Sequence, residues 1–339
     1  MACWAVNHSG KWLGEHQDGE IACQFDNYGY TLKGMEVIMG KGVAVICLLL
    51  SLLTFGPALA GGKTPVDAKT RAAIVGIFRK NIQHNTLTRA DELKQFGPAA
   101  FEVAATLLAD RALGDSAASV LVEMNPQKAG PVIFATMPKS DRNVQSHTFS
   151  YYTRCLLAGQ RFPFTRAMHD AAVRCLRANT NADAAVEALY AIGLTGSKAD
   201  FKLLAQWYTN QHQTAVWRVK LRVAAEAALA RLGHPTYLAK IKQQLATLYP
   251  TSITFDQAVL LDVAIQQAAF SNNPAFIPYL CRHLDDAAAQ PKGDLLPPTP
   301  SYSAAVVLDR LGKHTSKNNG DALAYWRQWW KKHQGEYRN

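Results

Sequence analysis

The sequence has few cysteines, modest charge and no long apolar run, and each of these features excludes a class of protein. Six Cys in 339 residues are too few for a scaffold held together by disulfides. No apolar run reaches about 18 residues, which excludes a protein that crosses a membrane several times. With 48% hydrophobic and 18% charged residues, the chain is too apolar to be disordered throughout. Its length suits two average domains or one elongated array.

Common catalytic and cofactor motifs are missing as well. The sequence contains no G-x-G-x-x-G, no Walker-type G-x4-G-K-[ST], no G-x-S-x-G, no H-E-x-x-H and no C-x-x-C. Its ten His are scattered, whereas a metal site needs three or four ligands that converge. We therefore predict no catalytic residue, no cofactor and no metal site, and we expect a protein that is not an enzyme.

One localised apolar stretch is present near the N-terminus. A short segment with one Lys, 39–42, precedes the apolar run VAVICLLLSLLTF at 43–55. After a Gly-Pro break, Ala58 and Ala60 form the small-residue pattern that a signal peptidase cleaves. Residues 35–60 are therefore predicted to be a secretory signal peptide, and the protein to be periplasmic or secreted. A retained anchor and a buried core helix are the alternatives.

Residues 1–34 precede this signal, although secretory signals normally start within a few residues of the N-terminus. They show neither helical nor strand periodicity. We favour Met35 or Met39 as the true start and interpret 1–34 as a disordered upstream extension. N-terminal sequencing of the exported protein tests this interpretation.

Removal of the first 60 residues makes the chain more basic. That segment holds three of the 36 Lys and Arg and five of the 26 Asp and Glu. Residues 61–339 therefore carry 33 basic and 21 acidic side chains, a net charge of +12. Such an excess favours an anionic polymer or membrane surface as a partner.

The remainder of the chain shows helical periodicity and no alternating strand pattern. Pro98 and Ser197 suit the first turn of a helix, and so does the pair Asp115 and Ser116. The helices that we predict are 66–83, 88–96, 98–110, 114–124, 127–137, 143–158, 165–178, 181–193, 197–209, 214–232, 235–248, 254–270, 273–288, 301–312 and 320–334.

Four segments share the pattern Ala-x-x-x-Leu-x-x-(Met/Ile/Leu)-(Asn/Gly). Ala lies one turn before Leu on the same helix face, where a small side chain lets a neighbouring helix approach. The final Gly or Asn suits the left-handed position that closes a helix. Such helix pairs bury their apolar faces by stacking on one another. The segments are Ala117–Asn125, Ala185–Gly193, Ala225–Gly233 and Ala304–Gly312.

Residues 217–233, WRVKLRVAAEAALARLG, resemble the second helix of HEAT repeats, especially the short HEAT-like (phycobilin-lyase-type) repeats of bacteria. The stretch KQFGPAAF at 94–101 resembles the turn into a first helix of that family. The resemblance covers about 66–334. It implies an all-α fold for 61–339, a right-handed α-α solenoid of about seven helix pairs with a C-terminal capping helix.

The resemblance also bears on single residues. An Arg that tends to bridge neighbouring repeats in the family maps only onto Arg222. At the equivalent positions of the other copies the sequence has Gly114, Ala182 and Ser301. The resemblance therefore does not imply a regular polar ladder between the repeats.

Two groups of residues are candidates for a binding surface. The first group lies close to the middle of the predicted array of helices. It consists of Trp207, Trp217, Arg218 and Arg222, with Tyr208 and Lys220 beside them. Exposed aromatic and Arg side chains are typical of binding hot spots. The alternative is that the Trp rings pack between repeats and that the Arg side chains are solvated.

The second group is the aromatic stripe of the last predicted helix, formed by Trp326, Trp329 and Trp330. We interpret it as a cap of the last repeat, since terminal repeats need one. Contact of its basic flank with anionic lipid headgroups is the alternative.

Together these features predict an exported, monomeric, non-enzymatic HEAT-like scaffold that binds a protein partner through its concave helical face. The net charge motivates an alternative, an anionic envelope polymer or a peripheral anionic membrane surface, and salt dependence distinguishes the two. Export disfavours nucleic acid. A third alternative comes from the resemblance alone, because some HEAT-like proteins are lyases that act on tetrapyrroles.

Overall fold

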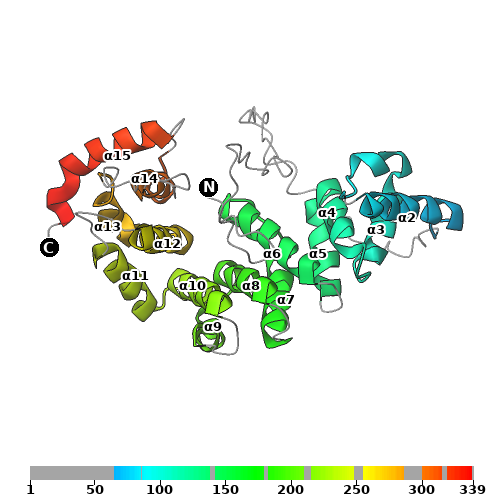
Figure 1. Ribbon diagram of the computed structural model, residues 1–339, viewed down its shortest axis with the longest axis horizontal. Coiled ribbons are helices and arrows are strands. Elements are labelled where there is room, and N and C mark those ends of the chain that lie inside the picture. The colour runs from blue at the N-terminus through cyan, green and yellow to red at the C-terminus, as the bar shows by residue number, and fades with distance from the viewer. Residues whose placement is uncertain are drawn as a thin grey trace, which may run out of the picture. The chain divides into compact units, whose positions relative to one another are not determined.

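The computed structural model divides the chain into two units, Met1–Pro65 and Val66–Asn339. It describes residues 65–84, 86–137, 142–178, 182–209, 215–247, 255–285, 300–314 and 319–337. The predicted extension and signal peptide lie outside these residues. Every regular element in these ranges is a helix (Figure 1), so the all-α prediction is confirmed there. None of these helices combines the length and apolarity needed to cross a membrane.

Fourteen α-helices and four 3-10 helices account for the regular structure of the described residues. The α-helices are α2 Ala68–Gln83, α3 Pro98–Leu107, α4 Gly114–Met124, α5 Pro126–Thr136, α6 Arg142–Leu157, α7 Thr165–Ala178, α8 Ala182–Thr195, α9 Phe201–Tyr208, α10 Ala215–Arg231, α11 Pro235–Thr247, α12 Phe255–Ser271, α13 Ile277–Cys281, α14 Pro300–Leu311 and α15 Asn319–His333. The 3-10 helices are η2 Asp91–Phe96, η4 Lys198–Asp200, η5 Pro274–Phe276 and η7 Gln334–Tyr337.

Most predicted helix bounds agree with these elements, and 114–124 and 165–178 agree at both ends. The helix predicted at 98–110 ends earlier, at Leu107, and three other predicted α-helices contain 3-10 segments. Residues 88–96 form the 3-10 helix η2, and 197–209 begin with η4 before α9 starts. The prediction at 273–288 covers η5 and the short α13, because Pro278 has no N–H for the bond that a continuous α-helix would need there. Residues 286–288 of this prediction lie outside the described residues.

Two of the predicted helix starts are confirmed. Pro98 occupies a first-turn position directly after Gly97, whose φ is +52°. Ser197 caps η4: its Oγ accepts the N–H of Ala199, and the carboxylate of Asp200 accepts the N–H of Ser197 at 2.8 Å. These two bonds form the reciprocal capping arrangement that satisfies the first turn.

The predicted cap at Asp115 and Ser116 is wrong. Helix α4 starts one residue earlier, at Gly114, and the turn before it is held by Asp110, whose Oδ1 accepts the N–H of Ala112 and of Leu113. Ser116 is buried and accepts the N–H of Thr88 at 2.9 Å. The short polar side chains near this helix start therefore tie it to other elements.

Helix packing follows the order of the chain. We call α4, α6, α8, α10, α12 and α14 the even-helix series, because each packs against the next member of the series. The other helices flank it: α3 and α5 pack on α4, α7 on α8, α9 and α11 on α10, and α13 and α15 on α14 (Figure 1). Contacts between helices that are close in sequence therefore dominate the fold.

The Ala and Leu positions of the repeated pattern all face the core. Each of these eight side chains is at most 2% exposed. They are Ala117, Leu121, Ala185, Leu189, Ala225, Leu229, Ala304 and Leu308. The repeat therefore correctly identifies the buried stripes of α4, α8, α10 and α14.

The last position of the repeat behaves differently in each copy. Gly233, with φ of +88°, takes the predicted left-handed conformation after α10. Asn125 is extended and caps α5 by accepting the N–H of Lys128. Gly193 and Gly312 lack side chains for close packing, because an added Cβ would meet the backbone of α10 or the ring of Trp326. The prediction of a closing residue is confirmed only at Gly233.

Candidate functional site

The four predicted partner-binding residues lie on α9 and α10, and they differ in exposure. Trp207 is only 6% exposed and packs in the core, so its ring offers a partner little surface. Trp217 is half-buried, and the Nζ of Lys220 lies 4.3 Å from its ring centroid. Arg218 is half-buried and Arg222 is exposed. Binding by these residues remains a prediction.

Tyr208, the last residue of α9, is the point where side chains from three helices meet. From α10, Arg222 donates to the Tyr208 hydroxyl at 3.5 Å, and its guanidinium carbon lies 5.2 Å from the ring centroid. From α11, Lys240 donates to the same hydroxyl at 2.7 Å, with its Nζ 4.8 Å from the centroid. Tyr237 packs edge-on against the ring at 5.1 Å. Two cations thus converge on one phenol.

Glu226 of α10 lies behind this group and balances one of its charges. It is 3% exposed, and its Oε2 accepts a hydrogen bond from Lys240 at 2.6 Å. Its Oε1 receives no hydrogen bond from the described residues. Burial raises the pKa of Glu226, and the bond from Lys240 offsets part of that effect. The hydrogen bonds from Lys240 and then Arg222 lower the pKa of Tyr208.

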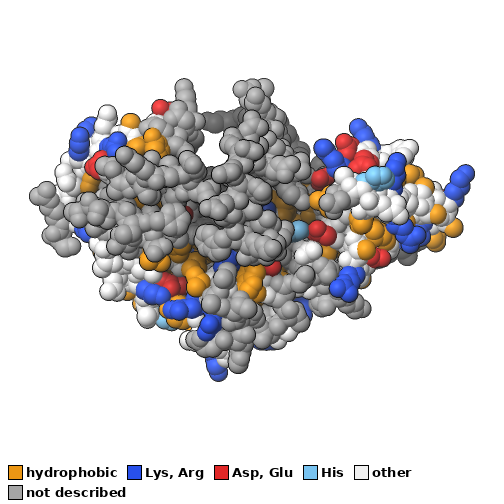
Figure 2. All heavy atoms as spheres, viewed as in Figure 1, with side chains coloured by type: hydrophobic (Ala, Val, Ile, Leu, Met, Phe, Trp, Pro, Cys, Tyr) orange, Lys and Arg blue, Asp and Glu red, His pale blue; other side chains and the backbone are white. Residues whose placement is uncertain are grey.

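Helices α9 to α11 hold a large share of the positive charge of the protein, and Figure 2 shows Lys and Arg side chains over α9 and α10. Residues 201–247 contain one acidic residue, Glu226, so their net charge is +6, half of the +12 of residues 61–339. The single carboxylate is buried against Lys240. The basic residues of this segment are Lys202, Arg218, Lys220, Arg222, Arg231, Lys240 and Lys242.

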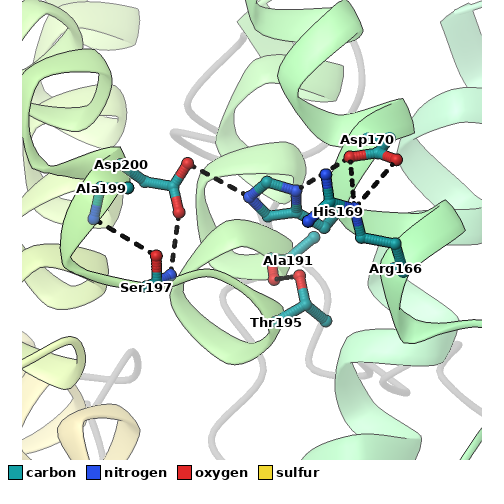
Figure 3. Close-up of polar contacts among 8 residues, drawn as sticks. All are labelled: Arg166, His169, Asp170, Ala191, Thr195, Ser197, Ala199 and Asp200. Carbon is teal, nitrogen blue, oxygen red and sulfur yellow. Dashed lines mark hydrogen bonds and ion pairs between the residues drawn. The ribbon is translucent and has the colours of Figure 1, made fainter.

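A second polar group surrounds His169 of α7 (Figure 3). Its Nε2 lies 3.2 Å from Oδ1 of Asp200, and its Nδ1 lies 3.3 Å from Oδ1 of Asp170, which also pairs with Arg166. The hydrogen bond with His169 is the main cause of the lowered pKa of Asp170. Since both ring nitrogens face carboxylates, His169 ties α7 to the turn that starts α9.

Ser197 in the same view is part of the helix cap and is not placed as a nucleophile. Its Oγ accepts the N–H of Ala199, and its own N–H donates to Asp200 (Figure 3). A nucleophilic serine needs a base that takes its hydroxyl proton, and here the imidazole of His169 contacts the two aspartates. The group is therefore a structural tie in this geometry.

A third polar group joins three members of the even-helix series. Nδ1 of His147 on α6 lies 2.8 Å from Oδ1 of Asp115 on α4, and this bond raises the pKa of His147. Glu187 of α8 is half-buried, and burial raises its pKa to about 7 although Arg154 opposes the shift. The raised pKa of Glu187 brings the titration of its carboxyl close to neutral pH.

The C-terminal helix has the contacts of a cap. Trp326 of α15 is 3% exposed, and its indole N–H donates to Asp309 of α14 at 2.8 Å. Trp329 and Trp330 are half-buried and pack on the same apolar cluster. These rings therefore cover the last member of the even-helix series.

Sequence reasoning identified Tyr208 and Arg222 but missed Lys240 and Glu226. Both lie within predicted helices, and no local pattern marks them as partners. Among the residues that the structure describes, no group of three or more His, Cys, Asp or Glu is placed to hold a metal ion. Comparison of the chain with family models, with curated proteins and with solved structures gave no match.

Proposed function

We propose that this protein is an exported, non-enzymatic HEAT-like α-solenoid that binds a protein partner through the helices of its concave face. The packing of the even-helix series, each helix against the next with flanking helices beside it, is the observation that carries this proposal. HEAT-like repeats pack in this way, and such repeats present extended surfaces that suit macromolecular partners. The step from repeat packing to partner binding is an argument from architecture.

Helix α10 is the place to test for a partner, since it is a member of the series and carries Val219, whose side chain is 62% exposed. The experiment introduces the photocrosslinker benzoylphenylalanine in place of Val219 in the full chain, in cells. We expect a crosslink to one protein species. Arg79, which is exposed on α2, serves as the control position for the crosslinker.

The same crosslinker at Arg79 controls for random collisions. Absence of crosslinks from position 219, or an identical set of products from both positions, would show that α10 does not bind a protein partner in cells. N-terminal sequencing of the crosslinked chain also tests export: processing after Ala60 supports the signal peptide, and an intact Met1 contradicts it.

An anionic envelope polymer is the second candidate, and the net charge of +6 over residues 201–247 is the observation that favours it. Binding of a polyanion falls steeply with salt because counterions are released when phosphates are neutralised. A steep salt dependence without any protein crosslink supports this candidate over the first.

A further inference from the structure

Helix α10 carries a row of three residues, two basic and one apolar, that reach its surface to different degrees. Arg218 and Arg222 are four residues apart and share one side of the helix, and Val219 is three residues before Arg222 on that side. Val219 is 62% exposed, and Arg222 is exposed as well. We call these three residues the α10 stripe. Solubility alone does not require a largely exposed Val beside an exposed Arg.

Tyr208 and Lys240 extend the stripe from the neighbouring helices. The hydroxyl of Tyr208 accepts hydrogen bonds from both Arg222 and Lys240, which occupy its lone pairs. Its own hydrogen is then left to donate, and no acceptor for it is found among the described residues. A phenol held by two cations is thus prepared to donate to an anion.

The electrostatics of this region also favour an anion. Glu226 is the sole acidic residue of 201–247, and it is buried in contact with Lys240. An incoming carboxylate therefore meets Arg222, Lys240 and the Tyr208 hydroxyl without an exposed acidic side chain from these helices. Arg and Lys are the usual donors to carboxylates in charge-assisted hydrogen bonds.

From these contacts we infer that the α10 stripe, with Tyr208 and Lys240, binds an acidic peptide segment that also carries apolar side chains. Its carboxylates contact Arg222, Lys240 and the Tyr208 hydroxyl, and an apolar side chain covers Val219. This inference rests on the proposed function and specifies the chemistry of the partner. Val219 is the reason to choose a peptide over a polyanion, because burial of its methyl groups stabilises only a ligand with apolar atoms.

Fluorescence anisotropy with defined peptides tests the inference on the full chain. The probe is a labelled peptide of three Glu-Glu-Leu repeats, and its comparison is a peptide of three Glu-Glu-Ser repeats. We expect the Leu peptide to bind more tightly. Arg222→Glu should weaken its binding about tenfold or more, since a charge that attracts becomes one that repels.

Two further variants test whether binding depends on the charge and the apolar side chain of the α10 stripe. Arg79→Glu makes the same change of charge on exposed α2, and we expect less than about a twofold effect because screening limits distant charges. Val219→Ser should weaken the Leu peptide and leave the Ser peptide unchanged. Circular dichroism melts of all variants check that each is folded.

Several outcomes would overturn the inference. If Arg79→Glu weakens binding as much as Arg222→Glu, the attraction is not local to α10. If the Ser peptide or polyphosphate binds as tightly as the Leu peptide, the site takes a simple polyanion. If crosslinking from position 219 captures a protein but the Leu peptide does not bind, the inference of an acidic peptide is wrong, and the proposed function is still supported. Peptide binding without any crosslink contradicts the proposed function instead.

Discussion

Gly130 of α5 lies against the ring of Phe164, and an added Cβ would overlap that ring. The ring cannot move freely because it packs on Tyr152 and Phe162, with centroids 5.2 and 5.0 Å away. We expect Gly130→Ala to lower the free energy of unfolding by about 1–2 kcal/mol, since overpacking exceeds the gain in helix propensity. Urea denaturation measures the change.

Gly76 supplies the matched control. It lies in α2, is exposed, and has no atom within 4 Å of an added Cβ. Gly76→Ala should therefore raise the free energy of unfolding by about 0.5–1 kcal/mol. If both substitutions change the free energy of unfolding in the same direction, the contact with Phe164 does not constrain α5.

The pair of His147 and Asp115 should make stability depend on pH. The hydrogen bond to Asp115 raises the folded pKa of His147 above its usual value. The bond therefore stabilises the folded protein fully below about pH 6.5, the pKa of His in the unfolded chain. This stabilisation is lost as the pH rises through the pKa of His147 in the folded protein. Because the His147 side chain is 49% exposed, we expect less than about 1 kcal/mol.

His147→Gln isolates this contribution. Urea denaturation of both proteins at about pH 5.5 and pH 8.5 compares stability below and well above the ordinary pKa of His. The variant should be less stable than the wild type at the lower pH, and the difference should shrink at the higher pH. A constant difference would show that the raised pKa of His147 does not contribute to stability.

Single residues also show what could be predicted from sequence. Ala225 and Leu229 were identified as core because helical spacing alone places them on one face. The role of Gly312 could not be predicted, because its neighbour Trp326 comes from another helix. Lys240 was missed for the same reason: its partners Tyr208 and Glu226 meet it only after three helices pack.

Helices are the level at which sequence reasoning was most accurate. Prolines, glycines and polar caps are local signals, so the ends of most helices were predicted closely. The distinction between α and 3-10 helix was not predictable at 91–96 or 198–200, since it depends on hydrogen bonds such as those between Ser197 and Asp200. The order of packing follows from the repeat, whereas the site between α9 and α11 requires the tertiary structure.

The contact between Glu226 and Lys240 should couple α10 to α11. Lys240→Met leaves a carboxylate buried without its cation, which we expect to cost about 1–3 kcal/mol. Glu226→Gln should cost less, because Lys240 is partly exposed and keeps its bond to Tyr208. In the double variant we expect the costs to be non-additive by more than about 0.5 kcal/mol.

The sign of the pH dependence gives an independent check on this pair. Burial raises the pKa of Glu226, so the carboxyl of the Lys240→Met variant takes up a proton more readily as the pH falls. The cost of that substitution should therefore decrease between about pH 7 and pH 5, the range above an ordinary Glu pKa. Urea denaturation measures all four proteins. Additive costs at both pH values would mean that the pair does not join the helices.

At the scale of the whole molecule, the described residues form two apolar clusters. One extends from Ile74 to Leu229 and the other from Ala230 to Trp326. Helix α10 contributes side chains to both. Since contacts are mainly between neighbouring helices, a local defect should weaken the adjacent helices more than distant ones. The proposed binding stripe lies on α10, whose buried side chains belong to both clusters.

Hydrogen exchange of two core variants tests this expectation. Leu308→Ala on α14 and Leu121→Ala on α4 each remove a fully buried side chain, at a cost of about 2–5 kcal/mol. Leu308→Ala should reduce the protection of amides in α12 to α15 and leave α3 to α6 little changed, and Leu121→Ala should do the reverse. A uniform loss of protection in both variants would mean that the clusters unfold as one unit. Separate responses would make α10 the junction between two semi-independent parts, so that a partner bound to its stripe would stabilise both.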